Sequence, residues 1–301
     1  MNITVIIPTK NRAKDLLVAV KSIINQTAVP NQLIIVDQSE TPQSEAFIKE
    51  LLEKTEIKLA YIYDRSITGL VHAKQVGVSN SIGDIVCFLE DDIELESPYI
   101  HAMIMAFEQR TDMMGCCGVV TNLAHLSKYY VYFFHLFHRG IFYDQRVGVH
   151  GFSGKLQSNL IPSRYLSGGT SAFRREVFDI IKFDVLNNFF MLEDIDFSTR
   201  ANNIFGQFFY INTKARLAHY MSPVNRAAYQ QRYQKKLREF IVFYKKHTRG
   251  TQDFIALIWL LIGMLLEAIF VCLSSGKLGP IKGCFMGIKD GIKWKLRADI
   301  K

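Results

Sequence analysis

The sequence lacks both a disulfide framework and a phosphate-binding loop. Its five cysteines form no C-x-x-C pair and no regular spacing, and only seven prolines occur in 301 residues. Scattered cysteines of this kind predict reduced, buried thiols and a cytosolic compartment. Neither G-x-x-x-x-G-K-[ST] nor G-x-G-x-x-G follows any apolar run, which argues against P-loop and dinucleotide-binding enzymes. The N-terminal apolar run is too short for a secretory signal.

Positive charge is concentrated at one end of the chain. The net charge is +8; residues 226–301 hold 15 Lys and Arg against 5 Asp and Glu, whereas residues 1–225 hold 21 against 23. A basic end beside an apolar stretch predicts contact with an anionic surface, either a membrane or a nucleic acid. With 49% hydrophobic residues the chain is too apolar to be disordered, and its length suits one domain with or without an appendage.

Apolar strands and helices alternate in the first 90 residues. The strands are expected at 3–8, 32–37, 57–63 and 84–90, and the helices between them at 13–26, 43–54 and 69–80. Continuous apolar strands joined by helices predict an α/β fold, with a mostly parallel sheet covered by helices on both faces. Right-handed crossovers place the carboxyl ends of all four strands along one edge, where open sheets bind ligands.

Polar and acidic residues follow each of these strands. In strand order they are Thr9, Asp37, Arg65 and the run Glu90-Asp91-Asp92. Adjacent carboxylates raise one another's pKa unless a cation neutralises them, and Mg²⁺ or Mn²⁺ bound together with a substrate diphosphate would do so. The alternative is a solvated turn entering a helix near Pro98, where acidic residues suit the helix dipole.

Five segments resemble glycosyltransferase family 2 in their order and rough spacing. They are VIIPTKNR, IIVDQS, GLVHAKQVGVSNSIGDIVCFLEDDIEL, SGGTSAFRREVF and LEDIDFSTR. The resemblance covers about residues 1–222 and implies an inverting, nucleotide-sugar-dependent enzyme with a GT-A fold. Each segment alone is a weak signal, but the ordered set is a strong one.

The resemblance implies donor and metal contacts at the strand ends. Asp92 would be a direct metal ligand, with His219 near the metal or the diphosphate, although a lone histidine is also often structural. Lys74 stands where the family often has arginine, so it keeps the charge but loses the planar fork. Glu90 replaces the first aspartate of the family's D-x-D motif and would face the ribose or stand behind the residues that contact the metal. The expected donor-binding set is Thr9, Asp37, Arg65, Lys74, Glu90 and Asp91.

Inversion needs a base that deprotonates the acceptor hydroxyl. By resemblance, LEDIDFSTR supplies Asp194 as this base with Glu193 beside it. Gly168 and Gly169 would let the backbone approach the sugar closely. The alternatives are two acids in the first turn of a helix and an ordinary glycine turn.

The C-terminal quarter contains a long apolar run. Residues 254–273 include one charge, Glu267, and are long enough to span a bilayer. Both flanks are basic, so a re-entrant or interfacial helix is preferred over a single span, because it keeps both flanks on the cytoplasmic side. A helical hairpin packed on the catalytic domain or on a dimer partner is the alternative. The tail would direct five side chains to lipid: Ile281, Phe285, Ile288, Ile292 and Trp294.

Together these features predict a catalytic domain over 1–225, a basic helix over 226–250 and membrane-associating helices over 251–301. The expected function is metal-assisted transfer of a sugar, with UDP as the default donor nucleotide, to a lipid-linked cell-surface glycan at the cytoplasmic face of the membrane. Mn²⁺ or Mg²⁺ is the expected cofactor, and no nucleic-acid partner is expected. A nucleotidyltransferase and a non-catalytic membrane-binding module are the alternatives.

Overall fold

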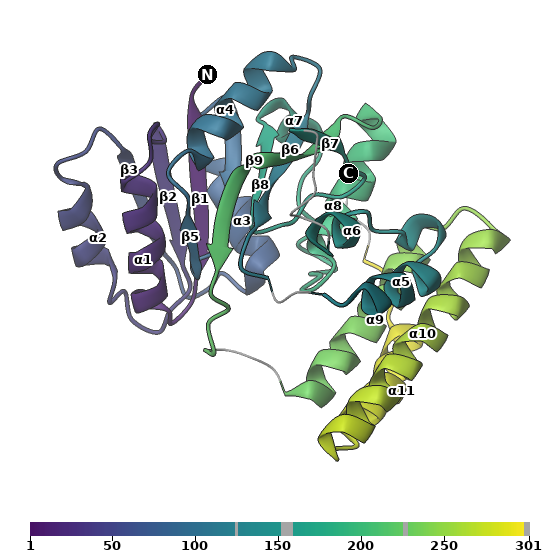
Figure 1. Ribbon diagram of the computed structural model, residues 1–301. Coiled ribbons are helices and arrows are strands. Elements are labelled where there is room, and N and C mark those ends of the chain that lie inside the picture. The colour runs from purple at the N-terminus through teal and green to yellow at the C-terminus, as the bar shows by residue number, and fades with distance from the viewer. Residues whose placement is uncertain (124–125, 152–158, 225–227, 298–301) are drawn as a thin grey trace.

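The computed structural model describes residues 1–123, 126–151, 159–224 and 228–297 (Figure 1). Four neighbouring strands form the parallel part of its sheet, in the order β3-β2-β1-β4. Their bounds are β1 Ile3–Thr9, β2 Gln32–Asp37, β3 Lys58–Tyr63 and β4 Ile85–Phe88. The predicted α/β fold with a mostly parallel sheet flanked by helices is therefore confirmed. The fourth strand ends at Phe88, two residues earlier than expected, although the Glu90 amide still donates to the Gly169 carbonyl (3.2 Å) in the register of the β4–β8 pair.

The sheet continues beyond β4 with strands whose pairing the sequence did not predict. The order runs β4-β8-β6-β9-β5, and β7 pairs with β9; the β4–β8, β8–β6, β9–β5 and β7–β9 pairs are antiparallel. The bounds are β5 Ile93–Leu95, β6 Gly115–Val120, β7 Leu160–Pro162, β8 Ser171–Arg174 and β9 Phe209–His219. The β5–β9 ladder sets Ile93 opposite His219, which brings the end of β9 next to the acidic run after β4.

Helices cover both faces of the sheet and explain its continuous apolar strands. On β1, Val5 and Ile7 point into one core cluster, and Ile6 points into the other. One face is covered by α1 Ala13–Ile24, α2 Glu45–Leu52 and α4 Tyr99–Gln109. The opposite face is covered by α3 Gly69–Ser79, α7 Glu176–Ile180 and α8 Glu193–Phe205. Burial on both faces leaves strands such as β2 with no polar alternation.

Three long helices at the C-terminus form a separate layer beside the sheet (Figure 1). They are α9 Tyr229–His247, α10 Thr251–Ser275 and α11 Gly279–Lys293. Glycines of α11 lie against the α9 main chain, because a Cβ at Gly283 or Gly287 would overlap the carbonyl oxygen of Gln230 or Gln234. Residues 226–227 of the predicted basic helix and residues 298–301 of the predicted tail lie outside the described residues.

The apolar residues of α11 do not form the single lipid-facing stripe expected from the sequence. Phe285 and Ile292 are 62% and 65% exposed. The other three, Ile281, Ile288 and Trp294, pack against the core of the C-terminal helices. One side of α11 packs against α9, and this packing covers the part of the expected stripe that would otherwise face lipid.

The aromatic segment around residues 129–143 becomes two short helices. These are α5 Lys128–Phe137 and the 3₁₀ helix Gly140–Phe142, followed by α6 Arg146–Gly151. Helix α5 packs on α10: the Phe137 and Trp259 rings are stacked 5.0 Å apart, and Trp259 Nε1 donates to the Leu136 carbonyl (2.8 Å). The α5 part of the aromatic segment therefore packs against the C-terminal helices.

Candidate active site

Two carboxylates and an imidazole converge where β4 and β9 end. The Nε2 atom of His219 lies 3.0 Å from Glu90 Oε2 and 3.0 Å from Asp92 Oδ1. The second oxygen of Asp92 accepts the Ser222 amide (2.7 Å), which fixes the carboxylate in this orientation. Three residues predicted to serve the metal and the donor, Glu90, Asp92 and His219, are therefore brought together by the sheet.

The charges in this cluster stabilise one another. Hydrogen bonds to Asp92 and Glu90 raise the pKa of His219 to about 10, so the imidazole is a cation between two anions. Burial disfavours the ionised form of Asp92, but the hydrogen bonds from His219 and the Ser222 amide outweigh it and hold the pKa of Asp92 below its usual range. The cluster thus already places a positive charge between these carboxylates, as expected for a site that accommodates a cation.

The same three side chains fit a divalent cation. One ligand atom from each of Glu90, Asp92 and His219 can be chosen so that all three lie within 4.8 Å of one another. Two carboxylate oxygens with one imidazole nitrogen form a mixed oxygen and nitrogen donor set, and carboxylate oxygen suits Mg²⁺ and Mn²⁺. Deprotonated His219 would be needed for it to act as a ligand.

Asp91 points away from this cluster towards the end of β1. Its carboxylate accepts from Thr9 Oγ1 (2.7 Å) and from Arg12 Nη1 (2.9 Å). Arg12 also reaches Asp92 Oδ2 at 3.5 Å and donates to the Val224 carbonyl at 2.8 Å. Arg12 is not among the expected site residues, although its place three residues after β1 is a usable signal.

Asp37 and Arg65 lie at the neighbouring strand ends. Asp37 is buried and accepts from the Tyr61 hydroxyl (2.6 Å) and from the Ser39 amide (2.8 Å). Burial and the hydrogen bond to Asp37 raise the pKa of Tyr61, so Tyr61 remains a donor. Arg65 follows β3 and is exposed. Contacts of Asp37 and Arg65 with a nucleotide stay predictions.

Lys74 and Glu193 form a buried ion pair. Lys74 Nζ lies 2.7 Å from Glu193 Oε1 and donates to the Gly168 carbonyl at 2.8 Å. The ammonium also lies near the Phe88 and Phe183 rings, 5.4 and 5.8 Å from their centroids. Burial raises the pKa of Glu193, and Lys74 opposes the rise. Lys74 is thus paired with Glu193 within the protein. Its contact with a diphosphate stays a prediction.

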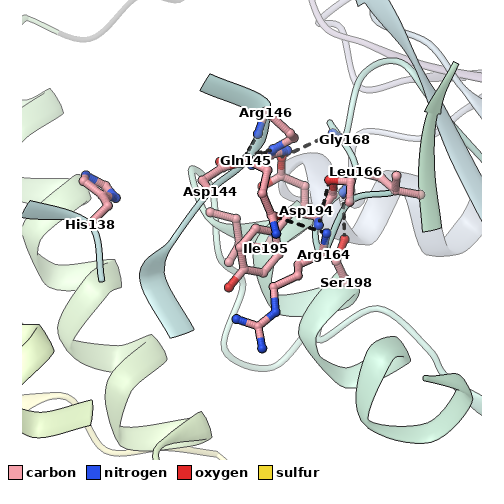
Figure 2. A network of polar contacts seen from close by, with 12 residues as sticks. His138, Asp144, Gln145, Arg146, Arg164, Leu166, Gly168, Asp194, Ile195 and Ser198 are labelled. Carbon is pink, nitrogen blue, oxygen red and sulfur yellow. Dashed lines mark hydrogen bonds and ion pairs between the residues drawn. The ribbon is translucent and has the colours of Figure 1, made fainter. Parts of the chain in front are cut away.

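Asp194, the predicted base, is bound by an arginine that the sequence analysis missed (Figure 2). Arg146 Nη1 lies 2.6 Å from Asp194 Oδ2, and its Nη2 lies 2.8 Å from Asp144 Oδ2. The Asp194 carboxylate also accepts the amides of Ile195 (2.8 Å) and Gly168 (3.4 Å). Arg146 and Asp144 escaped notice because they lie in a segment with no clear periodicity, 48 or more residues before Asp194.

Gly168 and Gly169 lie between the two acidic groups. A Cβ at Gly168 would overlap the Glu193 carboxylate, and a Cβ at Gly169 would overlap the Glu90 side chain. A side chain at either position would therefore force the facing acid to move, because the backbone passes directly against both acids. The arrangement sets a cluster that fits a cation on one side of a glycine turn and a pair of carboxylates on the other. Such a site can bind a metal–diphosphate and remove a proton near it.

The fold resembles that of solved glycosyltransferases. The S. aureus TarS fragment 1–349 bound to UDP-GlcNAc has a TM-score of 0.62 at 14% identity, with 97% of this chain and 81% of that chain covered. The mannosyltransferase PcManGT of Pyrobaculum calidifontis, in complex with GDP-Man and Mn²⁺, has a TM-score of 0.61 at 13% identity, covering 97% and 87%. At identities this low the likeness shows the fold alone, which is of the GT-A type.

Sequence relatives match over shorter stretches. A Campylobacter jejuni GalNAc(5)-diNAcBac-PP-undecaprenol beta-1,3-glucosyltransferase is 29% identical over 42% of this chain and 41% of its own length. An uncharacterized glycosyltransferase of Nostoc is 30% identical over 38% of this chain and 35% of its own length. The chain thus spans less than half the length of these curated relatives.

The sequence profile of Glycosyl transferase family 2 matches residues 4–181, more than half of the chain. The matched range begins in β1 and ends just after α7, so it includes the acidic run Glu90-Asp91-Asp92 and the turn Gly168-Gly169. The chain belongs to glycosyl transferase family 2.

Proposed function

We propose that this protein transfers a sugar from a nucleotide-diphosphate donor to a hydroxyl of a lipid-linked glycan, with inversion and at a membrane surface. The observation that carries the proposal is the glycine turn between two acidic groups. Glu90, Asp92 and His219 lie on one side of Gly168-Gly169, and Glu193 and Asp194 lie on the other. A leaving diphosphate needs positive charge to stabilise it, and an attacking hydroxyl needs a base to remove its proton. The first group, with a bound cation, is suited to stabilise the diphosphate, and the second group is suited to take the proton.

The strand ends would bind the donor. Asp92, with Glu90 and His219, would hold the divalent cation, which neutralises charge on the departing diphosphate when it is bound. Asp37 would contact the base or ribose, near Thr9 and Asp91. Arg65 and Lys74 would add positive charge close to the phosphates. The structural neighbours named above bind UDP-GlcNAc and GDP-Man, so UDP is a default for this chain and GDP is its main competitor.

Asp194 would take the proton from the acceptor hydroxyl. It begins α8 beside Glu193, and Arg146 holds one of its oxygens while the Ile195 amide contacts the other. Fixing the carboxylate in this way favours a single orientation towards the sugar, which is what a one-step displacement requires. Inversion then follows, because the nucleophile arrives on the face opposite the departing diphosphate.

Helix α10 supports the membrane part of the proposal. Its 25 residues contain a strongly apolar window of which 33% is buried inside the protein. Glu267 is turned inward, where the Tyr233 hydroxyl of α9 contacts it (3.3 Å). The face away from α9 exposes large apolar side chains: Ile255, Ile258, Trp259, Ile262, Leu266, Phe270 and Leu273.

An interfacial position of α10 fits these contacts better than a single span. One side of α10 packs against α9, a helix that carries seven Lys, Arg and His residues and could not enter the hydrocarbon core cheaply. The uncovered apolar side could lie in the membrane surface while basic residues face anionic headgroups. The Campylobacter relative, whose name places its acceptor on undecaprenol, supports a lipid-linked acceptor.

A thermal-shift series tests the donor part of the proposal directly. The full chain is heated with UDP, GDP, dTDP or CMP, each with Mn²⁺, Mg²⁺ or EDTA. A ligand that binds the native state raises the melting temperature by mass action. We expect one nucleotide to stabilise the protein only when metal is present. No stabilisation by any nucleotide, in protein shown to be folded, would contradict the proposal.

A further inference from the structure

A carboxylate from the C-terminal helices binds the chain just before the catalytic helix. Glu239, in the middle of α9, is buried. Its Oε2 accepts the amides of Phe190 (3.2 Å), Met191 (2.7 Å) and Leu192 (3.1 Å), and its Oε1 also contacts the Phe190 amide (3.2 Å). Three consecutive backbone amides therefore share one acidic side chain that lies 47 or more residues later in the sequence.

These three amides lead directly into Glu193 and Asp194. The residue that precedes α8 is Leu192, whose side chain cannot accept a hydrogen bond, and α8 has no side-chain cap. Amides at the start of a helix need acceptors, and an ionised acceptor makes stronger hydrogen bonds than a neutral one. Glu239 supplies this acceptor to the Leu192 amide from another element, and it also fixes the two residues before it. Its negative charge also lies near the positive end of the α8 dipole.

A second set of contacts joins the same two helices one turn further on. Asp196 in the first turn of α8 lies 2.7 Å from His247 Nε2 and 2.8 Å from Lys246 Nζ. Lys246 also pairs with Asp184, in the loop before α8. Because Glu239 and His247 lie two turns apart on α9, α9 holds the start of α8 at two points.

We propose that Glu239 is a positioning residue for the proton acceptor Asp194. Through the amides of residues 190–192 it fixes where α8 begins, and therefore where the Asp194 carboxylate lies relative to the donor. The inference rests on the proposed function, since it assigns a task to α9 in that reaction. It also makes the apolar C-terminal unit part of the catalytic architecture.

The test compares Glu239→Ala with a control that disturbs the same helices elsewhere. Gly283→Ala places a Cβ against the Gln230 carbonyl oxygen, which loosens α11 from α9 far from the 190–192 amides. Glu239→Gln keeps the side-chain shape and one acceptor, so it remains informative if the alanine variant folds poorly. The assay is metal-dependent release of nucleotide from UDP-GlcNAc and from GDP-Man, with kcat and the donor KM measured per folded molecule.

Glu239→Ala is expected to lower kcat by about tenfold or more while the donor KM changes less than about twofold. Glu239→Gln should fall between this variant and the wild type. Hydrogen exchange of the amides at 190–192 should accelerate in Glu239→Ala while the amides of α10 stay protected. Gly283→Ala should lower the melting temperature but keep kcat and KM.

Three results would overturn the inference. An unchanged kcat in folded Glu239→Ala shows that Asp194 is positioned without Glu239. An equal loss of kcat in Gly283→Ala shows that general loosening of the helices is responsible. A rise in donor KM in place of a fall in kcat assigns Glu239 to donor binding. If the wild type releases nucleotide from neither donor, the proposed function itself fails. If the wild type is active and Glu239→Ala has the same rate, only the inference about Glu239 fails.

Discussion

Arg146 is wedged between two carboxylates, with its Nη1 2.6 Å from Asp194 Oδ2 and its Nε 3.0 Å from Asp144 Oδ1. Burial disfavours the charge on Arg146, but the two aspartates outweigh it and raise the pKa of the guanidinium well above its usual range. Asp144 benefits in turn, because Arg146 overcomes its burial and holds the pKa of Asp144 below its usual range. The proposed base thus belongs to a fixed network with Arg146 and Asp144.

Replacing Arg146 by lysine should therefore impair turnover more than binding. Lysine keeps the positive charge but cannot contact Asp144 through two nitrogens and reach Asp194 with a third. We expect kcat to fall about tenfold with donor affinity unchanged, measured by nucleotide release and by titration of the donor. Arg110→Lys is the matched control, since Arg110 pairs with Asp112 at the surface. Loss of donor affinity in Arg146→Lys would instead place Arg146 in the donor site.

Asp92→Asn should abolish metal-dependent nucleotide binding and leave the fold intact. The asparagine keeps an oxygen for the Ser222 amide but loses the charge that faces His219 and a cation. The readout is the metal-dependent thermal shift with the nucleotide that stabilises the wild type. Glu94→Gln, an exposed change in the adjacent strand β5, should keep the full shift. Unchanged nucleotide affinity in Asp92→Asn would defeat the assignment of the metal site.

Asp194→Asn should spare donor binding and stop transfer. The side chain keeps its shape and its contact with the Ile195 amide, but it can no longer accept a proton. We expect a drop in kcat of about a hundredfold or more, with the metal-dependent thermal shift retained. Full activity in this variant would assign the base to Glu193 or Asp196 instead. The substitutions Glu193→Gln and Asp196→Asn would then show which of these two is the base.

The pair of changes Phe270→Glu and Leu273→Glu should weaken membrane binding without unfolding the protein. These side chains are 71% and 81% exposed, so the fold does not depend on them. Each substitution removes roughly 2 kcal/mol of apolar transfer free energy. We therefore expect the double variant to bind anionic vesicles at least about tenfold more weakly, as measured by vesicle flotation. Val18→Glu, on an exposed face of α1, is the control. Equal flotation of both proteins would show that α10 does not touch the membrane.

Acid should remove the contribution of Asp196 to stability. Burial opposes ionisation, but the His247 hydrogen bond, with Arg200 and Lys246, holds the pKa of Asp196 below its usual range. A carboxylate with a depressed pKa binds fewer protons when folded than when unfolded, so its contribution is present above about pH 4 and is lost as the pH falls below that.

The comparison for this pH effect is wild type against Asp196→Asn in urea unfolding. At pH 7 we expect the variant to be less stable by about 2–4 kcal/mol, because a buried charged network has lost one member. The difference should shrink at pH 3. A difference that stays constant from pH 7 to pH 3 would show that Asp196 contributes through shape alone.

The sheet and part of the site could be predicted because their signals are local. Apolar runs such as Ile34-Ile35-Val36 mark a strand buried on both faces, and the residues after each strand fall on one edge by topology. The structure brings Glu90, Asp92 and His219 together, and their roles stay predictions; His219 could be proposed only through the family pattern. In contrast, the antiparallel strands β5 and β7 are three residues long and carry too little periodicity to be recognised.

The residues that hold the proposed base could not be predicted, because their partners lie far away in the sequence. Asp144 and Arg146 stand in a region without period, and nothing in their neighbourhood points to Asp194. Glu239 is one acid within a basic helix, where it reads as a surface residue that balances nearby charge. Its importance comes from burial against three amides, which only the packed structure provides.

The contact between α9 and the start of α8 bears on how a soluble form of this enzyme should be prepared. Truncating at residue 225, before the basic and apolar helices, is the convenient choice for a protein proposed to bind membranes. That cut would delete the acceptor of the 190–192 amides and both partners that α9 supplies to Asp196. The shortened protein would lack these contacts at the start of α8, the helix that carries the proposed base. Its failure to turn over would say nothing about whether lipid is required.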